Sequence, residues 1–294
     1  MMEKFSVLIS VYHREKKEYL REALRSVFEQ TIEPDEVVLV KDGALTAELD
    51  EVVDEFESKY KSLKVLSLPE NVGLGMALNE GLKVCQYDLV ARMDSDDISM
   101  PQRFELQLKA FAENPELSIV GGWISEFEDD PAEIVSERRA PETDDQLKKY
   151  FRKKTPVNHV TVMFRRGRVL EAGGYQHFYL LEDYWLWGRM IACGATLYNV
   201  QQRLVNVRGG VSMATRRGGW RYAKGEVCLM YRFYKMGVIR FVDMLRNIAV
   251  RFPVRIMPSA IRALIYSKLL RKKIEGDSGF RHKKASEKNI PPAL

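Results

Sequence analysis

Three carboxylates follow an apolar run within four positions of the chain, and these side chains are the first candidates for chemistry. The run, Leu89 to Met93, is typical of a buried strand, and Asp94, Asp96 and Asp97 come directly after it. In an extended backbone Asp94 and Asp96 project to the same side, because side chains alternate with a period of two. Carboxylates this close repel each other unless a cation lies between them. Mg²⁺ or Mn²⁺ would remove that repulsion, since both take oxygen ligands and commonly bridge carboxylates to phosphates.

A solvated acidic turn is the alternative, and the cluster by itself favours it. A calcium-binding EF-hand loop is disfavoured, because Ile98 and Ser99 stand at its fifth and sixth positions and Pro101 interrupts it. An aspartyl-phosphate enzyme fits poorly, because its first carboxylate must be free to attack phosphorus. The glycines at 73 and 75 lack the third glycine of a dinucleotide-binding loop. The surrounding elements must therefore decide between a metal site and a plain turn.

Short apolar segments alternate with helical patterns in the N-terminal part of the chain. Strands are expected over residues 5–11, 36–40, 63–68 and 89–93, and helices over residues 18–30, 49–56 and 73–84. Continuous apolar strands separated by helices predict an α/β fold with a mostly parallel sheet flanked by helices.

Polar residues follow each of these expected strands. They are Ser10 and Tyr12, Asp42, Asn71, and the pair Asp94 and Asp96. Ligands of parallel sheets bind outside the carboxyl ends of the strands, where those ends meet at one edge. We therefore expect these side chains to surround one crevice, and that placement favours the metal site over the solvated turn.

The rest of the chain extends the α/β pattern and then changes character. Further helices are expected from residues 101 and 181, and further strands over residues 117–127, 161–164 and 197–207. Gly121 and Gly122 indicate a bulge or a close approach of two backbones. We expect a main domain over residues 1–219, a basic helical extension over 220–275 that Pro253 and Pro258 divide into shorter helices, and a disordered tail over 276–294.

Composition and charge narrow the class of protein. The 294 residues are 46% hydrophobic, enough for a large core, and the three separated cysteines favour a reducing cytoplasm. The N-terminus leaves no room for a signal peptide, and no uncharged apolar stretch reaches the length of about 18 residues that spans a bilayer. Residues 235–275 carry ten Lys or Arg and two acidic residues, whereas residues 1–234 have a net charge of −5. The basic segment is therefore expected to have a partner of its own.

Taken together, these motifs resemble glycosyltransferase family 2, the inverting GT-A type that uses a nucleotide-activated sugar. The resemblance covers about residues 5–210. It is carried by Ser10-Val-Tyr12, Lys41-Asp-Gly43, Asn71-Val-Gly73 with Ala77-Leu-Asn79, Arg92-Met-Asp-Ser-Asp-Asp97 and Glu182-Asp183. Among relatives the chain is most similar to bacterial transferases of exopolysaccharide, capsule and O-antigen assembly, on account of Asn158-His159 and the run Leu181-Glu-Asp-Tyr184. The resemblance implies a GT-A catalytic domain over residues 1–219.

The resemblance also implies roles for the residues at the crevice. Asp94 and Asp96 would hold Mg²⁺ or Mn²⁺ on the diphosphate of the sugar nucleotide, where the cation neutralises the leaving group. The residues expected to bind the nucleotide sugar are Ser10, Val11, Tyr12, Asp42, Asn71, Asn79, Arg92, Asp94, Ser95, Asp96 and Arg208. The alternative for Asp42 is an Asx turn, and the alternative for Arg92 is a salt bridge to Asp88 or Asp97.

The sequence departs from the family pattern after the last expected strand. Many relatives supply a His there as a further contact to metal or phosphate, but residues 208–217 contain none. Arg208, Arg216 or Arg217 would grip the diphosphate instead, from a glycine-flanked lid.

Asp183 is the candidate general base. Inversion in one step needs a carboxylate that removes the proton of the acceptor hydroxyl as it attacks the sugar. The start of a helix, where Asp183 is expected, stabilises an ionised carboxylate, and a purely helix-starting role is the alternative. Glu182, Trp185 and Trp187 are expected to contact the acceptor, although tryptophans in a helix near a core also serve as packing.

The predicted enzyme moves a sugar from a nucleotide-diphosphate donor, expected to be a UDP-sugar, to a hydroxyl of a lipid-linked oligosaccharide. The basic segment suits the surface of a bilayer, on the cytoplasmic face of a bacterial cell membrane. Its alternatives are packing against the core and contact with a second copy in a homodimer. Nucleic acid is not an expected partner. The alternative functions are a sugar nucleotidyltransferase and a non-catalytic module that binds nucleotide sugars.

Overall fold

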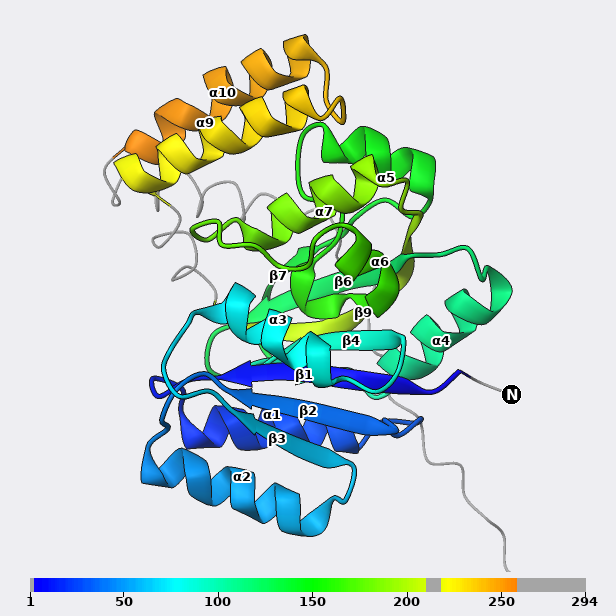
Figure 1. The fold of residues 1–294 in the computed structure, drawn as a ribbon, viewed down its shortest axis with the longest axis vertical. Helices are drawn as coiled ribbons and strands as arrows, with labels where there is room; N and C mark the ends of the chain where they lie inside the picture. The colour runs from blue at the N-terminus through cyan, green and yellow to red at the C-terminus, as the bar shows by residue number, and fades with distance from the viewer. Residues whose placement is uncertain (1–2, 210–217, 258–294) are drawn as a thin grey trace, which may run out of the picture.

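A computed structural model of the chain describes residues 3–209 and 218–257, with its elements arranged around one sheet (Figure 1). The strands are β1 (Phe5–Val11), β2 (Glu36–Lys41), β3 (Leu63–Ser67), β4 (Leu89–Asp94), β5 (Ile98–Ser99), β6 (Ile119–Phe127), β7 (Ile134–Arg138), β8 (Met163–Arg165) and β9 (Leu197–Arg208). The helices are α1 (Lys17–Phe28), α2 (Ala47–Lys59), α3 (Leu74–Val84), α4 (Arg103–Glu113), α5 (Asp144–Phe151), α6 (Arg166–Glu171), α7 (Glu182–Ala192), α9 (Trp220–Lys235) and α10 (Phe241–Ile256). The expected tail over residues 276–294 lies outside the described residues.

The sheet has the strand order β3-β2-β1-β4-β8-β6-β9-β5, and β7 pairs with β6. The run β3-β2-β1-β4 is parallel, as the apolar strands predicted. Beyond β4 the sheet becomes mixed, because β8 runs antiparallel to both β4 and β6, while β6 and β9 run parallel. The α/β fold is therefore confirmed, whereas the antiparallel direction of β8 and the short antiparallel strands β5 and β7 were not predicted from the sequence. The effect of β8 is to place β4 in the interior of the sheet.

Two hydrophobic layers cover the faces of this sheet. Helices α1, α2 and α4 bury their apolar faces on one side, together with the odd-numbered residues of β1 such as Phe5 and Val7. Helices α3, α5, α7 and α9 cover the other side, against Leu8 and Val38. In Figure 1, α1 and α2 lie below the sheet and α3 lies above it. Strands buried on both faces explain the continuous apolar runs in the sequence.

The glycines of β6 lie where two backbones approach, as the sequence predicted. The register between β6 and β9 shifts after Gly122, which marks a bulge. A Cβ atom added at Gly121 would overlap the side chain of Asn199, and one at Gly122 would overlap Leu204. Both positions favour a residue without a side chain, because side chains of the paired strand β9 fill the space beside them.

Helices α9 and α10 form a hairpin that packs on α7. Phe233 of α9 lies over Gly188 of α7, and Glu226 of α9 forms ion pairs with Arg251 and Arg255 of α10. The expectation that Pro253 divides the segment is wrong, because α10 continues to Ile256. Only one turn follows this proline, so few helical hydrogen bonds depend on it. None of the helices in residues 3–209 and 218–257 is long and apolar enough to cross a membrane.

The contact between Gly188 and Phe233 gives a test of how tightly the hairpin is docked. A Cβ at Gly188 would overlap the Phe233 ring, whereas a Cβ at Gly225 of α9 would lie 3.8 Å from its nearest neighbours, an ordinary contact. We expect Gly188→Ala to lower the free energy of unfolding by about 1–2 kcal/mol, because overpacking outweighs the gain in helix propensity. Gly225→Ala, the matched control, should raise it by up to about 1 kcal/mol.

Urea titration followed by circular dichroism measures both free energies. Equal stabilisation by the two substitutions would show that the Phe233 ring moves aside at little cost, so that its contact with Gly188 does not fix the hairpin.

Candidate active site

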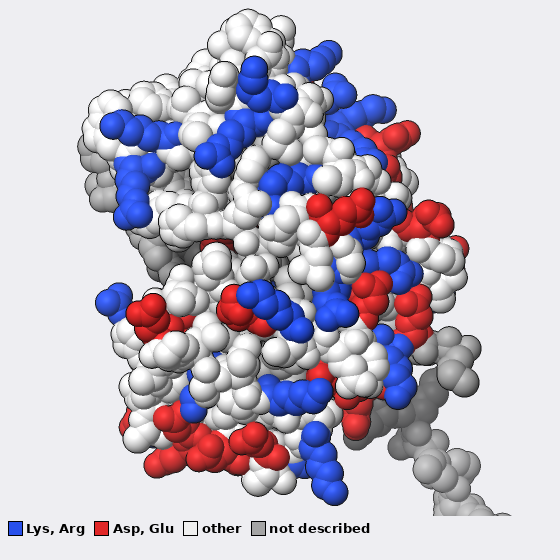
Figure 2. All heavy atoms as spheres, in the orientation of Figure 1, with Lys and Arg blue, Asp and Glu red and all other residues white. Residues whose placement is uncertain are grey.

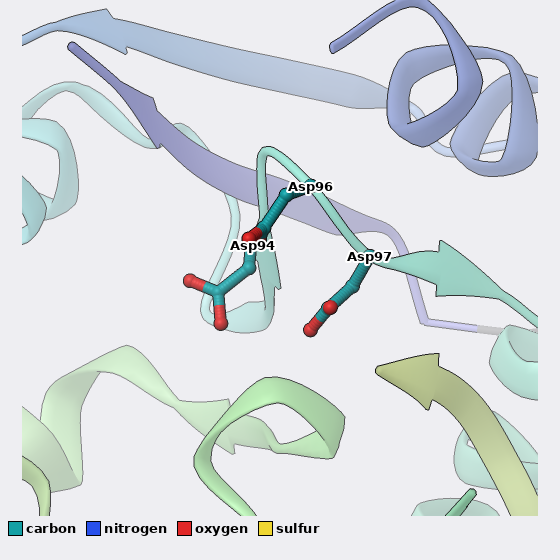
Figure 3. A group of neighbouring side chains, drawn as sticks. All are labelled: Asp94, Asp96 and Asp97. Carbon is teal, nitrogen blue, oxygen red and sulfur yellow. The ribbon is translucent and has the colours of Figure 1, made fainter. Parts of the chain in front are cut away.

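The acidic turn lies at the carboxyl end of β4, beside the end of β1. Ser10 of β1 is the register partner of Asp94, and Val11 is that of Lys41, so the ends of β1, β2 and β4 meet as expected. The carboxylates of Asp94, Asp96 and Asp97 lie within 4.8 Å of one another and gather beside the turn (Figure 3). The sequence selected Asp94 and Asp96 as metal ligands, and the structure adds Asp97 to the cluster.

Arg92 forms a bidentate pair with Asp94. Its guanidinium is buried and forms two hydrogen bonds to the Asp94 carboxylate, of which Nη1 to Oδ2 measures 2.7 Å. The alternative for Arg92 named a salt bridge to Asp88 or Asp97, whereas the observed partner is Asp94. Residues 92 and 94 point to the same face of β4, so the pairing follows from the strand period. Since the Arg92 side chain is occupied and buried, it acts on the site by orienting Asp94.

Arg208 anchors the other end of the turn. Its backbone N–H donates to Asp97 Oδ1 at 2.8 Å, and its Nε donates to the carbonyl of Asp96 at 3.2 Å. The guanidinium also pairs with Glu22 and lies 3.9 Å from the centre of the Tyr19 ring. Arg208 ends strand β9, so its expected place on a lid is wrong, whereas its contact with the diphosphate stays a prediction. Arg216 and Arg217 lie outside the described residues.

The carboxylates of the turn have perturbed acidities. Burial, together with the charges of Asp94 and Glu15, raises the pKa of Asp96 to about 7. Burial and the neighbouring carboxylates also raise the pKa of Asp97. Both shifts express the cost of placing negative charges together in a partly dry site, which a cation would remove. Three oxygen donors that repel one another suit a hard divalent ion such as Mg²⁺ or Mn²⁺.

Asp42 shapes the loop that follows β3. Its carboxylate accepts hydrogen bonds from the backbone N–H groups of Val72 at 2.7 Å and Gly73 at 3.1 Å, and from Asn71 Nδ2 at 3.0 Å. Asp42 and Asn71, both expected to bind the nucleotide, thus bind each other. Asp42 therefore has a structural role, as the Asx-turn alternative proposed, but its bonds run to the loop after β3 and not to its own turn. Contact of either residue with a nucleotide stays a prediction.

The other residues expected to bind the nucleotide sugar differ in their exposure to solvent. Tyr12 is exposed, Ser10 is half-buried, and Val11 is buried, so a contact from Val11 would use its backbone. Ser95 is buried, and its hydroxyl donates to Glu15 Oε2 at 2.7 Å. Asn79 accepts a hydrogen bond from the Tyr175 N–H at 3.1 Å, which ties α3 to the turn before α7.

Tyr175 lies at the site and is not among the residues that the sequence selected. Its buried hydroxyl forms a hydrogen bond of 2.8 Å with His159 Nε2. Its pKa is raised by burial and by the charges of Asp183, Glu182 and Asp94, so this phenol lies between the acidic turn and the start of α7. The two glycines before Tyr175 were the available signal, because both have positive φ and let the chain turn into the core.

Asp183 lies in the first turn of α7, half-buried, and its Oδ1 accepts the N–H of Tyr184 at 2.7 Å. Glu182 beside it has a raised pKa, because burial and the Asp183 charge outweigh the opposing charge of Arg92. This electrostatic contact with Arg92 shows that the start of α7 faces the end of β4. Leu180, two residues before Glu182, has a φ of 55°, which is strained for a residue with a side chain.

The expected contacts of the two tryptophans with an acceptor are not supported. Trp187 has no exposed surface, so a sugar cannot contact it, and the expectation is wrong. Trp185 is 8% exposed, stacks near Phe233, and donates from Nε1 to Gln176 at 2.9 Å. Both rings pack in the second hydrophobic layer, Trp185 near Phe233 of α9 and Trp187 beside His159. The packing alternative describes them correctly.

Solved structures with the same fold bind activated sugars. The mannosyltransferase of Pyrobaculum calidifontis, solved with GDP-Man and Mn²⁺, has a TM-score of 0.62 at 16% identity, covering 94% of this chain and 79% of that one. S. aureus TarS residues 1–349, solved with UDP-GlcNAc, has a TM-score of 0.61 at 18% identity, covering 86% of this chain and 72% of that one. At these identities the likeness establishes the GT-A fold.

Sequence relatives are closer. A UDP-Gal:alpha-D-GlcNAc-diphosphoundecaprenol beta-1,3-galactosyltransferase of Escherichia coli is 40% identical over 269 residues, which cover 92% of this chain and 97% of the relative. An amylovoran biosynthesis glycosyltransferase of Erwinia amylovora is 38% identical over 264 residues, or 90% of this chain and 98% of the relative. Residues 6–173 match the family described as Glycosyl transferase family 2. The chain therefore belongs to glycosyltransferase family 2.

Proposed function

We propose that this chain transfers a sugar, with inversion, from a UDP-sugar to a hydroxyl of a lipid-linked saccharide in bacterial surface polysaccharide assembly. The observation that carries the proposal is the cluster of Asp94, Asp96 and Asp97 at the end of β4, with the carboxylate of Asp183 at the start of α7 close enough that its charge and that of Asp94 both act on Tyr175. The donor and acceptor classes are those in the name of the Escherichia coli relative. A UDP-sugar is also the ligand in the S. aureus structure with the same fold.

Asp94, Asp96 and Asp97 would hold a divalent cation on the diphosphate of the donor. When bound, the cation neutralises the charge that develops on the leaving nucleotide. Asp96 is the member most available for this task, because Arg92 already binds Asp94 and the N–H of Arg208 binds Asp97. The cation expected is Mg²⁺ or Mn²⁺, and Mn²⁺ is the ion in the Pyrobaculum calidifontis structure.

Asp183 would act as the general base of the transfer. Within residues 3–209 and 218–257 its carboxylate accepts one backbone hydrogen bond, from its neighbour Tyr184, and so keeps oxygen lone pairs free to accept the proton of an acceptor hydroxyl. Glu182 beside it would contact the acceptor. Since the reaction uses a carbohydrate built on a membrane lipid, we propose that the protein works at the cytoplasmic face of the membrane.

Two alternatives remain distinguishable. A sugar nucleotidyltransferase would need a glycine-rich loop with a following lysine after β1, where this chain has Tyr12-His-Arg-Glu15. A module that binds nucleotide sugars without catalysis would bind donors and release no nucleotide.

A screen of donors tests the proposal directly. With Mn²⁺ present, a UDP-sugar should raise the midpoint of thermal unfolding, because a ligand that binds the folded state stabilises it by RT ln(1 + [L]/Kd), about 2.7 kcal/mol at a hundredfold excess over Kd. The matching UDP release should require a GlcNAc-diphospho-lipid or a similar acceptor. Absence of a shift with every sugar nucleotide tried would contradict the proposal.

Substitution of the proposed base separates binding from catalysis. Asp183→Asn should lower kcat by about a hundredfold to ten-thousandfold, the usual contribution of a general base, while the donor dissociation constant stays unchanged. The measurement combines UDP release with donor calorimetry. Glu182→Gln, one position earlier on the same helix turn, is the matched control and should change mainly the acceptor KM. Normal turnover by Asp183→Asn would show that another group takes the proton.

The acidity of Asp96 predicts how metal binding depends on pH. Its pKa of about 7 means that below pH 7 the carboxyl is protonated and must release a proton to bind a cation. The apparent affinity for Mn²⁺ should therefore fall by about tenfold per pH unit below 7 and level off above it. Asp96→Asn should abolish this dependence together with most of the affinity, whereas Asp54→Asn, on the exposed face of α2, should leave both intact.

Calorimetric titration with Mn²⁺ at several pH values measures both effects. An affinity that is equal at pH 6 and pH 8 would contradict the assignment of Asp96 as a ligand.

A further inference from the structure

Helix α10 buries Asp243 and Asn247 and exposes most of its apolar side chains. Asp243 and Asn247 are 2% and 5% exposed, whereas Val242 is 70% and Val250 64% exposed. Residues at helical spacing form a continuous outward stripe, hereafter the α10 stripe: Val242, Leu245, Ala249, Val250, Pro253 and Ile256. A helix on a soluble domain normally has the opposite polarity, so this face needs an apolar partner.

Polar contacts hold the helix in this orientation. Asp243 accepts hydrogen bonds from Arg240, and Asn247 Nδ2 donates to the carbonyl of Arg152 at 2.8 Å. Further along the same helix line, Arg251 and Arg255 pair with the buried carboxylate of Glu226 on α9. Because every turn of α10 carries such a contact, the rotation of the helix about its axis is fixed and the α10 stripe faces outward.

The exposed charges of the hairpin have one sign. Helices α9 and α10 hold two acidic residues, Glu226 and Asp243, and both are buried in the ion pairs just described. The exposed cations of the hairpin are Arg221, Lys224, Arg232, Lys235, Arg240 and Arg246. Figure 2 shows basic side chains around a broad uncharged surface over α9 and α10, at the top of the view, while acidic side chains gather at the bottom, over α2.

Aromatic side chains border the same surface. Trp220 is 63% exposed at the start of α9, and Tyr231 and Phe241 are about half exposed. Trp220, Tyr231 and Phe252 also line an open apolar groove of about 480 Å³ between the helices. Trp and Tyr favour the boundary between acyl chains and water, because their rings are apolar and their N–H or O–H groups remain hydrated.

We infer that the α9–α10 hairpin seats this protein on an anionic bilayer, with the α10 stripe in the acyl boundary and the surrounding cations on lipid phosphates. An apolar face ringed by basic residues gives both terms of interfacial binding, burial of apolar area and attraction to anionic headgroups. A second copy of the chain fits this face less well, because the two basic rims would repel each other.

The placement of the hairpin connects it to the candidate active site. Arg221 of α9 lies 4.0 Å from the centre of the Tyr179 ring, and Gly225 packs beside Phe178 and Leu181. These residues form the segment that leads into Glu182 and Asp183. A bilayer contact through the hairpin therefore sets the height of the proposed base above the lipid surface. This consequence rests on the proposed function, whereas binding to the bilayer does not.

Vesicle flotation of the full chain tests the inference without any measurement of activity. The protein should float with vesicles of phosphatidylethanolamine and phosphatidylglycerol, and float weakly with phosphatidylcholine alone. The substitutions Val242→Gln, Leu245→Gln and Val250→Gln should together reduce binding by about tenfold or more, because they remove apolar area from the interface. Lys224→Glu with Lys235→Glu should reduce it by about tenfold or more and only at low salt, because exposed charges are screened.

Matched controls use exposed positions of the same residue types elsewhere on the chain. Val84→Gln, Val135→Gln and Leu170→Gln, or Lys61→Glu with Lys109→Glu, should leave flotation unchanged. A wild-type chain that stays in the buffer fraction with the anionic vesicles overturns the inference. A wild-type dimer that the α10 stripe substitutions convert to a monomer would also overturn it, in favour of a second copy. Flotation without sugar transfer would leave the membrane face standing and contradict the proposed function alone.

Discussion

The bidentate pair between Arg92 and Asp94 is the interaction on which the site depends. Arg92 brings a positive charge into the interior of the sheet, where an unpaired charge is strongly unfavourable, and Asp94 supplies the balancing carboxylate. The pair thereby fixes the first carboxylate of the turn in one orientation. It also offsets part of the repulsion among the three aspartates, although the pKa of Asp96 stays raised. A site left with this residual negative charge retains its attraction for a cation.

A second arginine extends this support through the sheet. Arg103 of α4 has no exposed surface, and its Nη2 donates to the carbonyl of Arg92 at 2.6 Å. Burial and the adjacent charge of Arg92 lower the pKa of Arg103 to about 9. Gln107 accepts from Arg103 and donates to carbonyls of β6 and of the turn before β8, each at 2.8 Å. The acidic turn is thus attached to three elements that meet beneath it, and its geometry does not rely on a loop.

The same principle orders the loops around the crevice. Asp42 holds the segment after β3 and Asn79 holds the segment before α7, each by accepting hydrogen bonds from backbone N–H groups. Asp42 and Asn79, which the sequence predicted to bind the donor, thus hold the backbone of these loops in place. The carboxylates of Asp94, Asp96, Glu182 and Asp183 remain partly exposed, at the end of β4 and the start of α7. Because other polar groups hold the surrounding backbone, these four are available to a ligand.

Local patterns explain which parts of the structure were predictable. The strands β1 to β4, the acidic turn and the helix start at Glu182 follow from apolar runs and their polar ends, which neighbouring residues encode. The role of Arg208 was not predictable, because its N–H meets Asp97 across 111 positions of the chain. The burial of Trp185 depends on α9, whose Phe233 stacks near it from a later part of the sequence. The inverted polarity of α10 likewise depends on Glu226, a partner on another helix.

The two charged surfaces of the protein would meet their proposed negative partners in opposite ways. The proposed donor carries a diphosphate, and the acidic cluster would bind it through a cation, whereas the hairpin would contact lipid phosphates directly with exposed Lys and Arg. The partly buried cluster is screened little by salt, but exposed cations lose their effect beyond a Debye length of about 8–10 Å at physiological ionic strength. Because the apolar stripe of α10 is insensitive to such screening, it would retain the membrane contact when the charges alone could not. The pairing of a salt-sensitive rim with a salt-insensitive stripe is therefore the feature that would let the enzyme remain beside a lipid-linked acceptor while its donor site exchanges metal and nucleotide with solvent.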